Sequence, residues 1–180
     1  LLHSVLPAPV PLLFQHQSDP FKQVGEILTK GMNVMDGYYN NPEASNTVLS
    51  PDGWLHTGDL GVLDPDGYLY IKGRSKSLIL GPSGQNIYPE EIEDLLNAQP
   101  YIAESLVIER EGKLVALVYP DAEAMKQNKI SREALLKIIH ETRKQINQQI
   151  PAYSQIARIE IHDEEFEKTP KRSIKRFLYQ

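Results

Sequence analysis

The chain has 180 residues, of which 41% are hydrophobic and 24% charged, as expected of a folded, soluble protein. A formal net charge of −5 argues against nucleic-acid binding, and the absence of cysteine excludes disulfides, thiolate metal sites and cysteine nucleophiles. Residues 1–14 are apolar but contain Pro7, Pro9 and Pro11 and no basic leader, so they predict neither a signal peptide nor a membrane span. We expect a cytoplasmic protein, with peripheral membrane attachment left open.

The first part of the chain predicts a small β-rich subdomain. The segment 25–31 has the pattern of a short strand between glycines, and residues 40–43 form a turn that leads into a short helix. A second turn follows at 50–53. Two strands, residues 60–63 and 68–72, then flank Asp64-Pro65-Asp66-Gly67, whose proline and glycine are typical of a hairpin turn.

The pattern changes after Gly73-Arg74, and we place a domain boundary near residues 74–77. Beyond it the sequence predicts a helix at 89–99, strands at 102–109 and 113–119, a helix at 131–149 capped by Ser131, and a strand at 156–161. This order predicts a compact α+β domain in which helices cover one face of a small sheet.

Two polar residues border the predicted hairpin. Asp59 follows a Thr-Gly turn, and an ionised carboxylate there could accept hydrogen bonds from a pair of vicinal hydroxyls. Arg74 leaves the second strand and could face the same ligand, where its planar fork suits a ribose or phosphate oxygen. We therefore expect the two side chains to converge on one face. Taken singly, each residue could equally be a turn cap or a surface arginine.

Three consecutive motifs make the pattern specific. They are W-x-x-T-G-D-x-G at 54–61, G-Y-x-x-x-x-G-R-x-K at 67–76 and G-x-N-I-Y-P-x-E-I-E at 84–93. From about Gly25 to its end the chain resembles the adenylate-forming enzymes, which include acyl-CoA synthetases, aryl-CoA ligases, luciferases and peptide-synthetase adenylation domains. The resemblance implies that residues 1–75 are the end of a large adenylation domain and residues 76–180 its mobile C-terminal domain.

The resemblance also implies the chemistry. Such enzymes use ATP with Mg²⁺ to convert a carboxylate into an acyl-adenylate and then transfer the acyl group to a thiol such as coenzyme A. Asp59 and Arg74 would bind the ribose hydroxyls of AMP, and Lys76 would occupy the hinge of the mobile domain. Gly84 would lie in the loop along which the pantetheine arm enters, although Gln85 stands where many relatives have lysine. The five histidines lack metal-ligand spacing, so we predict no metal site held by this chain.

The tail departs from the pattern at one position. Residues 166–176 resemble the last motif of the family, in which a lysine contacts the acyl carboxylate and the α-phosphate. Ser173 occupies that position here, and a hydroxyl cannot supply the positive charge. Lys171 or Lys175, on a tail expected to be flexible, could substitute. The alternative is a solvated basic tail with no catalytic part.

Three functions remain open. The motif style of residues 73–79 and 86–91 looks closer to bacterial long-chain fatty acid–CoA ligases than to peptide-synthetase domains, so a fatty acid and coenzyme A are the first expectation for the substrates. An aryl- or short-chain acyl-CoA ligase is the alternative enzyme, and a degenerate carrier-interaction module is the non-catalytic one. The Ser/Thr/Gly-rich phosphate loop and most of the acyl pocket of the family are missing, so these residues should not catalyse without the rest of the large domain.

Overall fold

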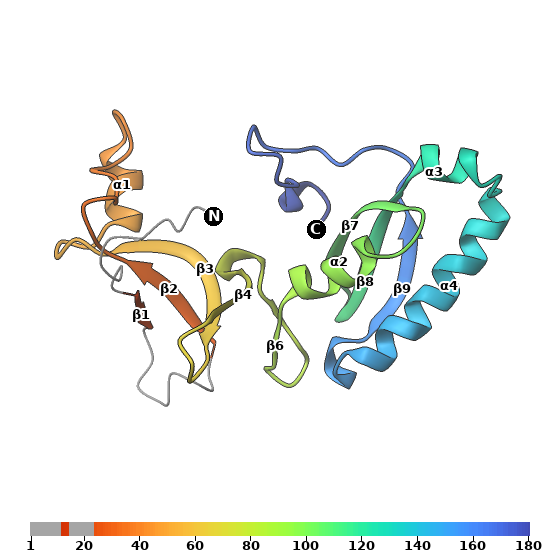
Figure 1. Ribbon diagram of the computed structural model, residues 1–180, viewed down its shortest axis with the longest axis horizontal. Coiled ribbons are helices and arrows are strands. Elements are labelled where there is room, and N and C mark those ends of the chain that lie inside the picture. Colours follow the sequence, from red (N-terminus) through yellow and green to blue (C-terminus); the bar gives the residue numbers. More distant parts are fainter. Residues whose placement is uncertain (1–11, 15–23) are drawn as a thin grey trace, which may run out of the picture. The chain divides into compact units, whose positions relative to one another are not determined.

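The computed structural model describes residues 12–14 and 24–180, which fall into two compact units, Leu1–Lys76 and Ser77–Gln180 (Figure 1). The expectation for the apolar residues 1–14 lies almost entirely outside the described residues. Within the described part of the chain, no helix is both long and apolar enough to cross a membrane.

The first unit is built on an antiparallel sheet in which strand order follows chain order. Its strands are β1 (Leu12–Phe14), β2 (Gly25–Thr29), β3 (Leu55–Leu63) and β4 (Leu69–Arg74), with α1 (Pro42–Val48) between β2 and β3. Asn41 caps α1, because its Oδ1 accepts the Ala44 N–H at 3.0 Å. The predicted hairpin is present, and Asp64 closes its turn by accepting the N–H of Asp66 and of Tyr68.

The second unit is the predicted α+β domain. Its sheet consists of β7 (Ile102–Arg110), β8 (Lys113–Pro120) and β9 (Ile156–Ile161); β7 and β8 are antiparallel, and β8 and β9 are parallel. Parallel strands need a crossover, and α4 (Arg132–Gln149) supplies it, capped by Ser131 as expected. The remaining elements are α2 (Pro89–Asn97), the short helix α3 (Ala122–Gln127), the strand pair β5 (Ile79–Leu80) and β6 (Asn86–Ile87), and the 3-10 turns η1 (Ser75–Ser77), η2 (Ala152–Ser154) and η3 (Arg176–Leu178).

The sheet of the second unit is buried on both faces. On one face Val107, Ala116 and Val118 pack against α2 and α4, whose Leu96, Leu135, Ile139 and Ile146 are also buried. On the other face lie the alternate residues Leu106, Ile108, Val115 and Leu117, and Phe166 of the C-terminal tail covers them. The prediction of helices on one face was correct.

The expectation of a flexible tail was wrong. Phe166 is only 2% exposed, and Ile174 and Tyr179 pack against the same cluster. The tail, residues 162–180, is therefore a layer of the fold, because it supplies the apolar surface that the second face of the sheet requires.

Candidate functional site

Asp59 and Arg74 meet in the first unit. They are register partners in the β3–β4 pairing, and Arg74 Nη1 lies 2.9 Å from Asp59 Oδ1. The Arg74 side chain is 58% exposed and that of Asp59 35%, so a ligand can reach both. Gly58 has a φ of +73°, a backbone conformation that favours glycine, and a Cβ there would only touch Arg74 Nη2, at 3.4 Å. The predicted convergence of the two side chains is confirmed.

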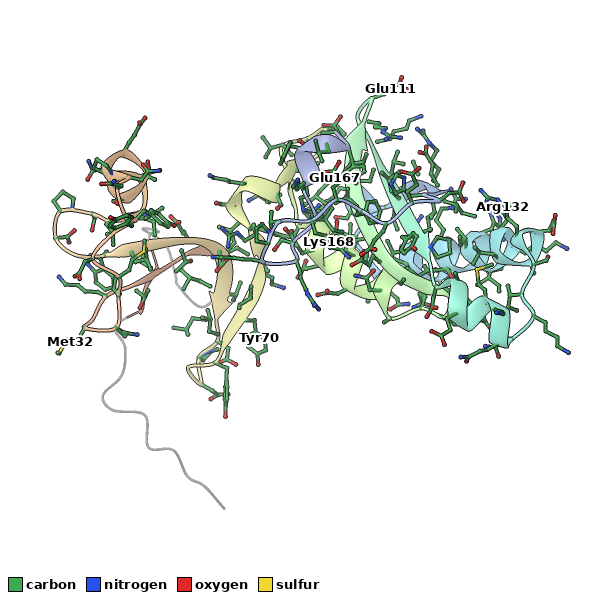
Figure 2. All side chains as sticks on the ribbon, turned by 90° about the horizontal axis from the view of Figure 1, so that it is seen from above. Met32, Tyr70, Glu111, Arg132, Glu167 and Lys168 are labelled. Carbon is green, nitrogen blue, oxygen red and sulfur yellow. The ribbon has the colours of Figure 1, made fainter. Side chains whose placement is uncertain are left out.

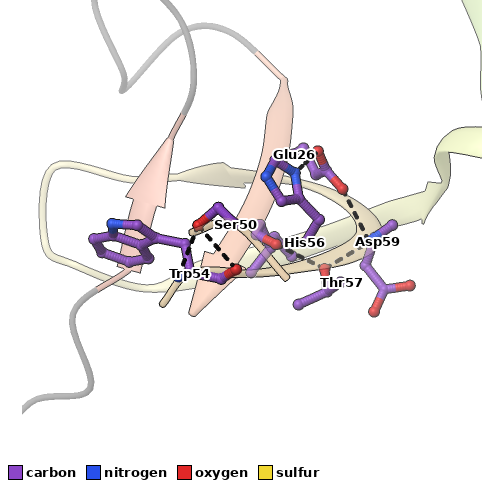
Figure 3. Close-up of polar contacts among 8 residues, drawn as sticks. Glu26, Ser50, Trp54, His56, Thr57 and Asp59 are labelled. Atoms are coloured by element: carbon purple, nitrogen blue, oxygen red, sulfur yellow. Dashed lines mark hydrogen bonds and ion pairs between the residues drawn. The ribbon is translucent and has the colours of Figure 1, made fainter. Parts of the chain in front are cut away.

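The expected Thr-Gly turn before Asp59 is instead a bulge inside β3, and Glu26 of β2 contacts His56 and Gly58 there (Figure 3). One carboxylate oxygen of Glu26 lies 3.0 Å from His56 Nδ1, and the other accepts the Gly58 N–H at 3.0 Å. Thr57 Oγ1 donates to the Ile27 carbonyl at 2.7 Å and accepts the Asp59 N–H at 3.0 Å. The backbone that carries the Asp59 carboxylate is thus fixed to the neighbouring strand.

Sequence reasoning missed Glu26 and considered His56 only as one of five histidines without metal-ligand spacing. The two residues are 30 positions apart, and only the β2–β3 register brings them together. The signal in the sequence was a charged residue, Glu26, directly after Gly25 in a predicted strand, and this did not indicate which residues Glu26 contacts.

Gly84 lies at the turn between β5 and β6, where its N–H donates to the Gly81 carbonyl at 2.9 Å. Its φ of +81° is a conformation that favours glycine, and no other atom of the described residues lies within 4 Å of where a Cβ would be. The backbone itself therefore requires glycine, and the space beside the turn is open. Beside this hairpin the second unit has a pocket of about 480 Å³, whose lining includes Ser83, Gln85, Lys113 and Tyr153. Lys76 is exposed within η1, at the end of the first unit.

Residues 168–174 of the tail form a tight hairpin. Lys168 and Ile174 are bridge partners, Thr169 N–H donates to the Ser173 carbonyl at 2.9 Å, and Arg172 N–H donates to the Thr169 carbonyl at 2.8 Å. Arg172 has a φ of +63°, as expected for the bulge residue that follows a three-residue hairpin loop. We call residues 169–173 the tail loop, with Lys171 and Arg172 at its exposed tip.

Ion pairs divide the basic residues of the tail into two groups. Lys168, labelled in Figure 2, contacts Glu104 at 2.8 Å and Glu165 at 2.6 Å. Its hydrogen bonds to these two carboxylates raise the pKa of Lys168, and the bond to Glu104 has the larger effect. Lys175 Nζ lies 3.1 Å from Glu167 Oε2. By contrast, neither Lys171 nor Arg172 has a side-chain partner among residues 24–180. The two sequence candidates therefore differ, because Lys175 is paired and Lys171 is free.

Arg176 reaches back to the helix and sheet of the second unit. Its guanidinium contacts Glu93 Oε2, lies 3.5 Å from Glu90 Oε1 and donates to the Val107 carbonyl at 3.3 Å. Glu93 is 8% exposed, and its Oε1 accepts the Val107 N–H at 2.6 Å. Burial raises the pKa of Glu93, and the charge of Arg176 offsets part of that shift. In residues 24–180 no three His, Asp or Glu side chains are grouped so that they could hold a metal ion.

Residues 76–179 match the family model described as the AMP-binding enzyme C-terminal domain. Since the match covers more than half of the 180 residues, the chain belongs to this family of AMP-binding enzymes. The family resemblance seen in the motifs is thereby confirmed.

Similar curated proteins are CoA ligases. The indoleacetate–CoA ligase of Aromatoleum aromaticum is 50% identical over 98 residues, covering 52% of this chain and 19% of that protein. A 2-succinylbenzoate–CoA ligase of Bacillus cereus is 41% identical over 122 residues, covering 68% of this chain and 24% of that protein. The chain thus spans about a fifth to a quarter of the length of these relatives.

Among solved structures, the O-succinylbenzoate coenzyme A synthetase of Bacillus subtilis in complex with AMP is 28% identical and has a TM-score of 0.70. The match covers 94% of this chain and 33% of that one. The same synthetase in complex with ATP and a magnesium ion gives a TM-score of 0.69, with 29% identity over 93% of this chain and 33% of that one. The similarity extends over both units of the chain.

Proposed function

We propose that this chain is the C-terminal part of an acyl-CoA ligase that activates an aryl or short-chain carboxylic acid. In the first half-reaction the carboxylate oxygen attacks the α-phosphorus of ATP, which is supplied as its magnesium complex; an acyl–AMP bond forms and pyrophosphate leaves. In the second, the coenzyme A thiol loses its proton and attacks the acyl carbon, releasing AMP. The observation that carries the proposal is the ion pair between Asp59 and Arg74. Both residues stand in family motifs that directly precede the matched residues 76–179 in the sequence.

Asp59 and Arg74 would bind the ribose of the nucleotide. The Asp59 carboxylate can accept hydrogen bonds from both vicinal hydroxyls, while Arg74 donates to a ribose oxygen. Their mutual contact at 2.9 Å holds each charge near its working position before the ligand arrives. Hydrogen bonds also fix the backbone at Gly58 and Asp59. Asp59 therefore loses less conformational freedom when the nucleotide binds.

The two structural units suggest how the reaction could be divided. We propose that residues 1–75 end the large adenylation domain and that residues 76–180 are the mobile domain, hinged at Lys76. Gly84 would lie on the path of the pantetheine arm of coenzyme A. The open space beside the Gly84 turn supports this assignment, since nothing in residues 24–180 blocks an approach to its backbone.

Lys171 is the better candidate for the adenylation cation. Ser173 holds the family lysine position but has no charge, and Lys175 already neutralises Glu167. The ammonium of Lys171 sits at the exposed tip, two positions before Ser173, with no carboxylate paired to it in the described chain. An unpaired cation can offset the repulsion between the substrate carboxylate and the α-phosphate as they approach.

The names of the relatives favour one of the two substrate classes. Indoleacetate and 2-succinylbenzoate are both aromatic carboxylates, which favours the aryl- or short-chain alternative over a fatty acid. The fatty-acid hypothesis rests on the motif style of residues 73–79 and 86–91 and stays a prediction.

The test is to assay the full-length protein with ATP, magnesium, coenzyme A and a panel of aryl, short-chain and long-chain acids. We expect AMP release and acyl-CoA formation to be fastest with aryl or short-chain acids. Highest turnover with long-chain acids would contradict the proposed substrate class. Neither product with any acid, from a protein that still binds a carrier or coenzyme A, would favour the non-catalytic module, which Ser173 makes worth testing.

A further inference from the structure

Glu93 of α2, Val107 of β7 and Arg176 of η3 meet at one point of the second unit, although Glu93 and Arg176 are 83 positions apart. Glu93 uses one carboxylate oxygen for the Val107 N–H and the other for Arg176. Arg176 returns to the same residue by donating to the Val107 carbonyl. We call these three residues the tail clamp.

The charged side chains of the tail clamp are mostly shielded from water, which makes their geometry specific. The side chains of Glu93 and Arg176 are 11% and 20% exposed. A charge removed from water must be paired and hydrogen-bonded, and loss of one partner leaves the other uncompensated. Arg176 is held more tightly than a surface arginine for this reason, since Glu93, Glu90 and the Val107 carbonyl all accept from or attract its guanidinium.

A second attachment holds the tail on the other side of the tail loop. Phe166 stacks on His162 with ring centroids 4.8 Å apart, and Tyr179 meets Phe166 edge-on at 5.2 Å. Tyr179 Oη also accepts the Glu167 N–H at 2.8 Å. The tail loop thus lies between Phe166 on one side and Arg176 with Tyr179 on the other.

We propose that Glu93 and Arg176 are positioning residues for adenylation, acting through the tail loop that presents Lys171. This inference rests on the proposed function. Neither residue need contact the substrate: Arg176 fixes the chain just after the loop, and the loop fixes the cation. A displacement of about 1 Å at a reacting group can cost on the order of 10²-fold in rate, so a loop that supplies one charge must be held firmly.

The first measurement is amide hydrogen exchange on the chain carrying Arg176→Gln. We expect exchange to rise by about tenfold or more at Thr169, Arg172 and Lys175, whose N–H groups close the tail hairpin, with the β8 amides unchanged. The matched control is Arg132→Gln, which makes the same chemical change in an exposed ion pair with Asp163 and should leave all of these amides unchanged. Unchanged exchange at the three tail amides in Arg176→Gln overturns the inference, whatever the activity of the enzyme.

The second measurement separates positioning from general stability in the full-length protein. Glu93→Gln keeps an acceptor for the Val107 N–H but loses the charge that holds Arg176. We expect Glu93→Gln and Arg176→Gln to slow acyl-adenylate formation by roughly 10- to 10²-fold, while thioester formation from preformed acyl-adenylate changes far less. Arg176→Lys should recover part of the adenylation rate.

Equal slowing of both half-reactions would overturn the inference, because it would show a structural role only. The proposed function fails differently, since the unaltered protein would then form no acyl-adenylate. Even then, amide hydrogen exchange would show whether the tail clamp orders the tail loop.

Discussion

The two candidate sites of this chain are held in place by contacts of different range. Asp59 and Arg74 are neighbours across one hairpin, 15 positions apart in the chain, and their convergence follows from a turn and a strand register. The tail loop depends on contacts of 69 and 83 positions, from Arg176 to Val107 and Glu93. A site built on a hairpin should therefore tolerate damage elsewhere, whereas the tail loop should fail when distant supports are removed.

The largest expected effect is on the support of the tail. Phe166→Ala should lower the free energy of unfolding of the second unit by about 3–5 kcal/mol, because it deletes a buried aromatic side chain and leaves a cavity. Urea denaturation of the chain measures this. Phe177→Ala is the matched control, since Phe177 is 71% exposed and its loss should cost under about 0.5 kcal/mol. Similar costs for the two changes would mean that the tail is not part of the core.

The next effect concerns the charge at the loop tip. Lys171→Ala should slow adenylation by roughly 10²–10³-fold, by analogy with the loss of an oxyanion donor. Lys175→Ala should slow it much less, because Lys175 is paired with Glu167. Both half-reactions should be measured in the full-length protein, and thioester formation from preformed acyl-adenylate should change little in either variant. If Lys175→Ala proves the more damaging, the assignment by ion pairing is wrong; if neither slows adenylation, the tail has no catalytic cation.

A smaller effect is expected at the hairpin site. Arg74→Gln should weaken AMP binding to the full-length protein by about 10- to 10²-fold, the usual value of a hydrogen bond to a charged group. Calorimetric titration with AMP measures it. Arg110→Gln, which breaks a half-buried ion pair with Glu160 in the second unit, is the control and should bind AMP normally. Equal affinity in Arg74→Gln and the control would remove Arg74 from the nucleotide site.

The smallest effect is a dependence of stability on pH. Burial raises the pKa of Glu93 in the folded state, so the folded chain holds its proton more tightly than the unfolded chain does. Its contribution to stability is therefore complete below the unfolded pKa and falls as pH rises through the folded pKa. Hydrogen bonds from Arg158 and Arg132 lower the pKa values of Glu160 and Asp163, respectively. The stability that these two carboxylates contribute is therefore lost only as pH falls through their lowered pKa values.

Glu93→Gln should remove the fall in stability that Glu93 causes as pH rises above its unfolded pKa, because glutamine does not titrate. Urea denaturation of both chains at several pH values compares them. We expect the unaltered chain to gain stability relative to Glu93→Gln as pH is lowered from neutral toward the unfolded pKa. A difference between the two chains that stays constant with pH would contradict a raised pKa for Glu93.

Local patterns in the sequence predicted most of the elements and the hairpin site. The Asp64–Gly67 turn, the Ser131 cap and the helical spacing of α4 each act over a few residues, so their outcome can be deduced from the chain alone. The helix α3 was missed because it is short. Glu26 and Glu93 were missed as supports because a charged residue on a strand or helix usually faces water, and nothing nearby in the sequence names a distant partner.

Reading the tail as flexible was the main error, and its cause is specific. The basic residues between Lys168 and Arg176 suggested a solvated segment, yet three of them are neutralised by carboxylates from α2, β7 and the tail itself. Phe166 was treated as part of a motif, although the alternate residues of β7 and β8 already required a cover for the second face of the sheet.

β7 is an outer strand of its sheet, and its Val107 points both backbone polar groups away from β8. Such a free edge invites pairing with a strand from another molecule. Here two side chains, Glu93 and Arg176, satisfy those groups instead. A protease cut before Arg176 would remove Arg176 and Tyr179, and would therefore uncover a hydrogen-bonding edge together with part of the apolar cluster around Phe166, so that truncated chains should self-associate where intact ones do not.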